Sequence, residues 1–181
     1  MSTQETHRLG PANGALRVRT GRSGAVARAG HDLLIEVGAW EATLDLDGAA
    51  STLILRADSS SMRVLEGTGG MMQLGDDDKA AILQTIGEDV LKDADVEFRS
   101  TASSADGDRY EITGELTLNG VTHPLTFELD ASAGARLSGS ALVKQSDWGI
   151  KPYTTLFGAL KVADEVAVSF DGDALESGEE S

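Results

Sequence analysis

The amino-acid sequence predicts an all-β fold, an eight-stranded antiparallel barrel with one α-helix. Apolar and polar residues alternate with a period of two in short runs, and glycine, aspartate and serine separate these runs. This pattern is typical of antiparallel strands joined by turns. Because so little helix is available to cover the strands, closure into a barrel removes their exposed edges. The predicted strands cover residues 16–19, 33–46, 53–57, 96–100, 110–118, 121–129, 136–145 and 162–170.

The second predicted strand changes its apolar face part of the way along. Apolar side chains occupy the odd positions of residues 33–37 but the even positions of residues 40–46. A straight strand cannot change parity without turning its core face to water. We therefore predict a β-bulge or a sharp bend at Gly38-Ala39, a device by which barrels curl.

One segment between the third and fourth strands has helical spacing. Residues 59–75 are rich in serine, glycine and methionine and predict a long loop. Asp76 is a suitable N-cap for a helix over residues 77–91, because the helix dipole favours the acidic residues of its first turn. The apolar stripe of this helix consists of Ile82, Leu83, Ile86 and Val90.

The clearest turn in the sequence is Asn119-Gly120. Both central residues of a type I′ turn need a positive φ, which asparagine and glycine tolerate. A two-residue turn here places the apolar positions of both flanking strands on one face, so the register is self-consistent. The pairs that this turn predicts are Leu118 with Val121, Leu116 with His123, and Ile112 with Phe127.

Length, charge and composition limit the classes of function. The chain has 181 residues, of which 40% are hydrophobic, and a net charge of −15. This charge argues against a nucleic-acid partner, because a phosphate backbone would be repelled. No apolar run is long enough for a spanning helix, so we expect no stable membrane insertion. The polar N-terminus lacks the apolar core of a secretory signal, which favours a cytoplasmic location.

We expect one domain of this length, with loose ends. Residues 14–171 are predicted to form the barrel domain. Residues 1–13 are predicted to form a flexible N-terminal arm, and residues 172–181 an acidic C-terminal tail. Both segments are polar and terminal, and chain ends are where order is lowest.

Signatures of catalysis and of metal binding are nearly absent from the sequence. It has no Gly-x-Ser-x-Gly elbow, no Walker loop and no cysteine. Its histidines, His7, His31 and His123, do not have zinc-site spacing. We therefore predict no metal, no cofactor and no enzymatic activity. The remaining catalytic hypothesis, acid–base chemistry by His31 with an acidic neighbour, lacks a positioned partner.

Two segments are candidates for contact with a ligand. His31 lies where a glycine-rich stretch enters a strand, and its imidazole could bind a ligand head group or orient a loop. The segment 147–158 gathers Trp148, Tyr153 and Phe157, three of the eight aromatic residues. Long loops without secondary structure are usually functional. These aromatics could line a pocket or plug the barrel end, and a plug can also line a pocket.

Several segments resemble the YceI-like family in order along the chain. The segment 116–127, LTLNGVTHPLTF, resembles the central hairpin of the family. Gly30-His31-Asp32-Leu33 resembles an early histidine-bearing segment, and DWGI at 147–150 followed by VADEVAV at 162–168 resembles the later motifs. The resemblance covers residues 14–171 and implies a lipocalin-like barrel closed by a helix. It implies binding of polyisoprenoids, isoprenoid quinones or other long apolar chains, and it allows a homodimer.

We therefore predict a binding or carrier protein that holds a polyisoprenoid, an isoprenoid quinone or another lipid inside the barrel. Burial of apolar surface, worth roughly 25 cal/mol per Å², would drive capture. The small inward residues Gly114, Gly139 and Ala141 are expected to leave room for a tail. The alternative is a structural or stress-response module with a side-chain-filled barrel and a partner-binding surface, and a cavity calculation distinguishes the two. The predicted ligand-binding residues are His31, Trp40, Phe98, Ile112, Phe127, Trp148, Tyr153, Phe157 and Phe170.

Overall fold

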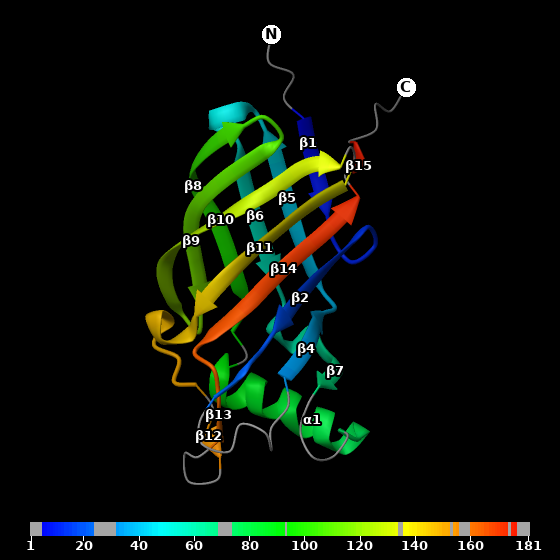
Figure 1. Cartoon of the computed structure of the whole chain (residues 1–181), viewed down its shortest axis with the longest axis vertical. Helices are drawn as coiled ribbons and strands as arrows, with labels where there is room; N and C mark the ends of the chain where they lie inside the picture. The colour runs from blue at the N-terminus through cyan, green and yellow to red at the C-terminus, as the bar shows by residue number, and fades with distance from the viewer. Residues whose placement is uncertain are drawn as a thin grey trace.

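The fold is an antiparallel β-sheet that curls into a barrel, with the helix α1 (Asp76–Thr85) across one end and the strands β1 (Glu5–Leu9) and β15 (Leu175–Glu176) at the other (Figure 1). The structure is a computed structural model that describes residues 5–23, 32–68, 74–92, 94–133, 136–152, 154–155, 160–173 and 175–176. The main sheet has the strand order β15-β1-β5-β6-β8-β9-β10-β11-β14-β2-β4-β7. Its strands are β1 (Glu5–Leu9), β2 (Gly14–Arg19), β4 (Asp32–Val37), β5 (Trp40–Leu46), β6 (Thr52–Ala57), β7 (Met62–Thr68), β8 (Val96–Asp106), β9 (Arg109–Leu118), β10 (Val121–Ala133), β11 (Arg136–Lys144), β14 (Glu165–Asp173) and β15 (Leu175–Glu176).

The all-β barrel fold is confirmed, but the sheet has twelve strands where we predicted eight. The second predicted strand is divided at its bend into β4 and β5. Strands β1, β7 and β15 were not predicted. They are short or irregular in sequence, and long-range pairing rather than local pattern makes them strands.

The bend at Gly38-Ala39 is present and closes the barrel. Strand β4 pairs with β2 and β7, whereas its continuation β5 pairs with β1 and β6. The segment between β6 and β7 bends at the same level and is hydrogen-bonded to this bend. The amide of Gly38 donates to the carbonyl of Ser61 over 2.9 Å, and the amide of Asp58 donates to the carbonyl of Ala39 over 3.0 Å. A Cβ at Gly38 would lie 2.8 Å from the oxygen of Ser61, so the close approach requires glycine. The bent pair therefore contributes β4 and β7 to one end of the sheet and β5 and β6 to the other, which joins the two ends.

The hairpin at Asn119-Gly120 is also confirmed. Both residues have positive φ angles, 50° and 73°. All three predicted pairs, Leu118 with Val121, Leu116 with His123, and Ile112 with Phe127, occur in the register of β9 and β10.

The helical segment begins and ends differently from the prediction. Gly75, not Asp76, is the N-cap residue, and its amide donates to the carboxylate of Asp78 over 2.9 Å. Asp76 is instead the first helical residue, where its charge still suits the helix dipole. The helix changes after Thr85 into the π-helical turn η4 (Ile86–Val90), closed by a hydrogen bond from the Leu91 amide to the Ile86 carbonyl.

Both predicted chain ends are partly built into the sheet. The arm predicted over residues 1–13 contains β1, which pairs along its whole length with β5 and buries Leu9. The tail predicted over residues 172–181 contains the end of β14 and β15, which pairs with β1. These two predictions are wrong for the described residues, because backbone pairing between distant segments orders them despite their polar composition.

The two predicted loops likewise contain regular structure. The segment 59–75 includes the 3₁₀ turn η3 (Ser59–Ser61) and β7, which pairs with β4. The segment 147–158 includes the end of the 3₁₀ turn η5 (Gln145–Trp148). It also contributes to a second, three-stranded sheet, which consists of β12 (Thr154–Thr155), β13 (Leu160–Val162) and β3 (Arg22–Ser23). This small sheet lies at the same end of the barrel as α1 (Figure 1).

Candidate functional site: an apolar cavity under the helix

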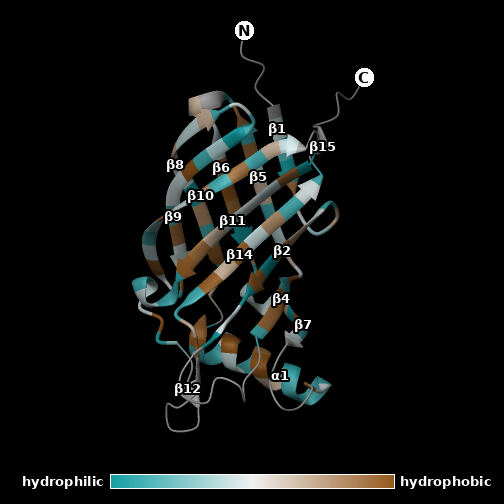
Figure 2. Ribbon diagram, in the orientation of Figure 1, coloured by the Kyte–Doolittle hydropathy of each residue, from teal (hydrophilic) through white to brown (hydrophobic). Residues whose placement is uncertain are grey.

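The half of the barrel nearest α1 contains a cavity of about 570 Å³. This volume lies within the range of roughly 300–1,000 Å³ that small-molecule sites occupy. Its walls come from inward-facing positions of β2, β4, β6, β8, β9, β10, β11 and β14, on which apolar and polar residues alternate (Figure 2). The aliphatic wall residues on these strands are Leu16, Val18, Leu33, Ile35, Val37, Leu53, Leu55, Ala57, Val96, Leu116, Leu118, Leu125, Ala141, Val143, Val166 and Val168.

The helix and its π-helical turn cover the open end of the cavity. Ile82, Ile86 and Val90 lie on the cavity side, spaced four residues apart as one helical face requires. None of the residues of α1 or η4 is fully buried, but Leu91, immediately after the turn, is only 7% exposed. The helix is therefore attached most firmly at its C-terminal end.

Three polar lining residues, Thr20, Arg22 and Gln145, lie at the edge of the mouth formed by the end of β2, β3 and η5. The side chain of Gln145 is buried, and its amide donates to the carbonyl of Ala163 over 3.1 Å. The amide of Ala163 in turn donates to the carbonyl of Gly21 over 3.0 Å. Next to Gly21, the Nε of Arg22 lies 3.0 Å from a carboxylate oxygen of Asp32. Arg22 is thus the charged residue among the described lining residues, and its charge is paired.

The opposite end of the cavity is closed by Phe98, Phe127 and Phe170, which we call the phenylalanine layer. The rings of Phe98 and Phe127 meet edge to face with their centroids 5.4 Å apart. The rings of Phe127 and Phe170 do the same at 6.2 Å. Edge-to-face packing is a favoured geometry for aromatic pairs, so the three rings support one another across the barrel.

Beyond the phenylalanine layer the barrel is filled. Leu44, Ile112 and Leu129 have no exposed surface, and Leu9 and Leu137 are nearly as buried. None of these five residues lines the cavity. The barrel is therefore hollow in one half and filled by side chains in the other, so a hollow and a filled interior each describe part of it.

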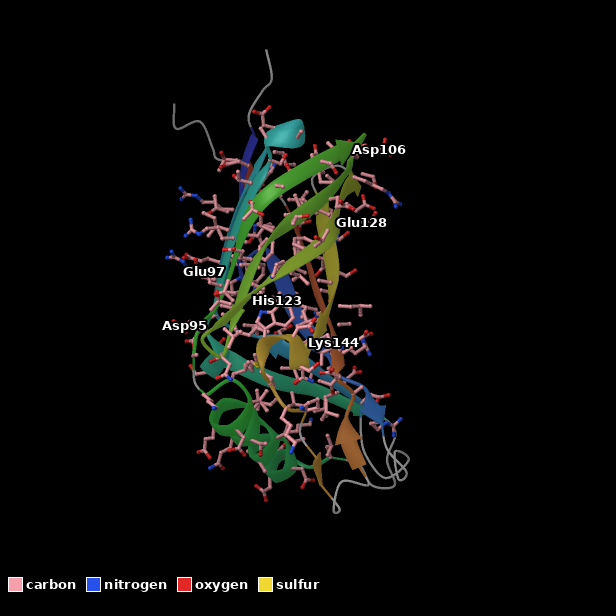
Figure 3. The ribbon with its side chains drawn as sticks, turned by 90° about the vertical axis from the view of Figure 1, so that its left-hand side faces the viewer. Asp95, Glu97, Asp106, His123, Glu128 and Lys144 are labelled. Carbon is pink, nitrogen blue, oxygen red and sulfur yellow. The ribbon has the colours of Figure 1, made fainter. Side chains whose placement is uncertain are left out.

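The residue Trp148 anchors the segment that follows β11. Its indole is 2% exposed, and its Nε1–H donates to the carbonyl of Leu116 over 2.7 Å. Its ring also meets that of His123 edge to face at 5.2 Å. Figure 3 shows His123 beside the η5 turn, on the outside of the barrel end. His123 is exposed.

The structure divides the nine predicted ligand-binding residues into three groups. Phe98, Phe127 and Phe170 line the cavity as expected. The second group does not line the cavity although its members, Trp40, Ile112 and Trp148, are buried. The side chains of Trp40 and Ile112 point into the closely packed core, and Trp148 packs below the rim of the barrel. The third group, His31, Tyr153 and Phe157, lies outside the described residues.

Part of the cavity lining was not among the predicted ligand-binding residues. Ile82, Ile86 and Val90 belonged to the predicted helical stripe, and that stripe was the signal that a partner surface faced the helix. Of the small residues expected to leave room for a tail, Ala141 lines the cavity. Gly114 and Gly139 do not, because phenylalanine rings occupy the space beside them.

Among the residues that the structure describes, no cluster of three or more histidine, aspartate or glutamate side chains could hold a metal ion. Within the same residues, α1 and the shorter helical turns are too short or too polar to span a membrane.

Comparisons with known proteins agree with this architecture. The family model of the YceI-like domain matches residues 36–174. A UPF0312 protein of Pseudomonas aeruginosa is 44% identical over 71 residues, which cover 34% of this chain and 37% of the relative. Protein YceI of Escherichia coli O157:H7 is 41% identical over 63 residues, covering 30% and 33%. The aligned segments thus span only about a third of the length of these relatives.

Solved structures show the same fold at lower sequence identity. BcnA of Burkholderia cenocepacia superposes with a TM-score of 0.64 at 21% identity, covering 90% of this chain and 96% of that one. The YCEI protein of Campylobacter jejuni superposes with a TM-score of 0.59 at 16% identity, covering 80% and 85%.

Proposed function

Because this chain belongs to the YceI-like family, we propose that it binds a molecule with one long apolar chain, such as a polyisoprenoid or an isoprenoid quinone. The single observation that carries the proposal is the apolar cavity of about 570 Å³ under α1. A barrel meant only as a scaffold would gain stability by filling this space, since interiors pack densely and voids are costly.

The lining favours burial of a chain over recognition of a polar molecule. Most of the wall consists of leucine, isoleucine, valine and phenylalanine side chains. Each buried methylene contributes about 0.8 kcal/mol, so a chain that fills the cavity binds well without many polar contacts. A cavity lined in this way selects by length and shape, which suits unbranched or isoprenoid tails.

The distribution of polar groups sets the orientation of the ligand. Gln145 and Arg22 lie at one edge of the mouth, whereas the phenylalanine layer closes the far end. The head group therefore lies beside Gln145 and Arg22, and the tail points toward the phenylalanine layer. Because Asp32 already pairs with Arg22, we favour an uncharged head group, such as a quinone or an alcohol, over a carboxylate.

The proposal also concerns whether the protein catalyses a reaction. We propose a carrier rather than an enzyme, because the described lining residues include no pair of acid and base side chains in contact. A cytoplasmic location and a homodimer stay predictions.

The direct test is to identify what the protein carries. Gently purified protein is extracted with organic solvent, and the extract is analysed by mass spectrometry for isoprenoid and lipid species. Protein without an endogenous ligand is offered quinones and polyprenols. An empty barrel that takes up neither would refute the proposal.

A matched pair of variants on β11 tests whether the cavity is the binding site. Ala141 lines the cavity, and its neighbour Leu142 points outward with 66% of its surface exposed. We expect Ala141→Trp to fill the cavity and weaken ligand uptake at least about tenfold, because overpacking leaves no space for a chain. Leu142→Trp adds the same indole outside and leaves uptake unchanged. Equal uptake by both variants would place binding elsewhere.

A further inference from the structure

The phenylalanine layer lies at the boundary between the hollow and the filled halves of the barrel. Phe127 is its central member, because its ring contacts those of both Phe98 and Phe170. The three residues come from β8, β10 and β14, on different parts of the barrel wall. Since all three rings line the cavity, a chain that enters from the mouth at α1 meets them last.

Glycines hold two of the rings in place. A Cβ at Gly114 would lie 2.6 Å from the ring of Phe98 and 2.4 Å from the backbone oxygen of Arg99. A Cβ at Gly139 would lie 2.5 Å from the ring of Phe170. The rings of Phe98 and Phe170 therefore lie over these glycines, in space that a side chain at either position would occupy.

The residues behind the layer leave no route past it. Ile112, the cross-strand partner of Phe127, has no exposed surface, and neither have Leu129 and Leu44. Interiors packed in this way have few voids larger than a water molecule. A ligand chain cannot continue beyond the rings without displacing core side chains.

We infer that the phenylalanine layer is a floor that sets the longest apolar chain the cavity accepts, with Phe127 as the main specificity-determining residue. The inference rests on the proposed function, because it concerns the length of the ligand held in the same cavity. A chain longer than the distance from the mouth to Phe127 leaves its excess methylenes in water, where they add no affinity.

The test measures affinity for a homologous series of straight-chain primary alcohols. For the wild-type protein, affinity rises about fourfold for each added methylene until the chain reaches the floor, and then levels off. Phe127→Ala removes the central ring and moves the levelling to longer chains. Phe127→Leu produces a smaller shift in the same direction and keeps the position filled, which guards against loss of the fold.

A second variant moves the floor in the opposite direction. Val168 also lines the cavity, one inward position nearer the mouth than Phe170 on β14. Val168→Phe places a ring above the layer and moves the levelling to shorter chains. The outward-facing neighbours serve as controls, since Thr126→Ala and Ser169→Phe change exposed positions on the same strands and leave the length dependence as it is in the wild type.

The outcomes separate this inference from the proposed function. If the wild-type protein binds none of the alcohols and none of the quinones or polyprenols, the proposed function and the floor are both wrong. If it binds the series but the levelling stays at the same length in Phe127→Leu and in Val168→Phe, only the floor is overturned. Opposite shifts in these two variants support it.

Discussion

Single side chains hold the segment that follows β11 against the barrel. Asp164 accepts hydrogen bonds from the amide of Ser146 over 2.8 Å and from its hydroxyl over 2.5 Å. The amide of Gln145 donates to the carbonyl of Asp164 over 2.9 Å. Because Gln145 lines the cavity mouth, this exposed carboxylate helps to position the polar edge of the site.

The pH dependence of this anchor follows from the pKa of Asp164. The hydroxyl of Ser146 lowers this pKa below the ordinary value of 3.8, with help from the Ser146 amide and Lys144 and against the effect of partial desolvation. A lowered folded-state pKa stabilises the fold above pH 3.8, and this contribution is lost as the pH falls through the folded-state pKa. We expect an NMR titration midpoint for this carboxyl below 3.8.

The variant Asp164→Asn should therefore lose less stability on acidification than the wild type does. The measurement is the melting temperature as a function of pH, with Glu165→Gln as the control at the adjacent exposed position. An identical acid decline in the wild type and in Asp164→Asn would show that the Ser146 hydrogen bonds do not contribute to stability.

At the scale of elements, α1 is the lid of the cavity. It is attached through the half-buried face formed by Ile82 and Ile86 and through the buried Leu91 that follows the π-helical turn. Segments with few buried contacts open more readily than the rest of a protein. π-Helical turns within helices often occur at functional sites. Here the turn η4 lies between α1 and Leu91, the residue that anchors the helix.

We expect Ile82→Ala to loosen the lid without unfolding the barrel. Removing part of a half-buried isoleucine costs about 1 kcal/mol of helix docking, which corresponds to roughly fivefold faster amide hydrogen exchange in α1. Exchange in β9 and β10 should be unchanged. Gln84→Ala, on the exposed side of the same helix, is the control. Equal acceleration in helix and strands would mean that α1 and the barrel open as one unit.

At the scale of the whole molecule, the barrel separates stability from binding. The filled half contains the most deeply buried leucines and the paired strands β1 and β15, whereas the hollow half contains the cavity and the lid (Figure 1). An empty cavity costs stability, and the filled half compensates for that cost. Ligand binding then adds stability to the folded state by mass action.

This division predicts that Leu9→Ala destabilises the protein without affecting ligand affinity. Leu9 is 3% exposed in β1 and does not line the cavity. Its truncation should reduce the free energy of unfolding by about 2–4 kcal/mol, measured by urea denaturation. Arg8→Ala, at the exposed neighbouring position, should be nearly neutral. A parallel loss of affinity in Leu9→Ala would contradict the separation of the two halves.

The features that the sequence predicted correctly depend on local backbone geometry or on strand parity. The turn at Asn119-Gly120 needs positive φ angles, and the bend at Gly38-Ala39 is required by a change of parity. Parity also shows which side chains point inward, and Phe98, Phe127 and Phe170 do line the cavity. The barrel fold, its helix and the place of these three residues on the cavity wall could therefore be predicted.

Depth along the barrel was decided only by the tertiary structure. Ile112 and Phe127 share the inward face and are cross-strand partners, yet one is in the filled core and the other lines the cavity. Parity carries no information about where along the axis the packing stops. The same limit applies to β1 and β15, because their pairing joins segments at opposite ends of the chain. A pattern within one segment specifies its faces, but only packing between distant segments specifies what those faces meet.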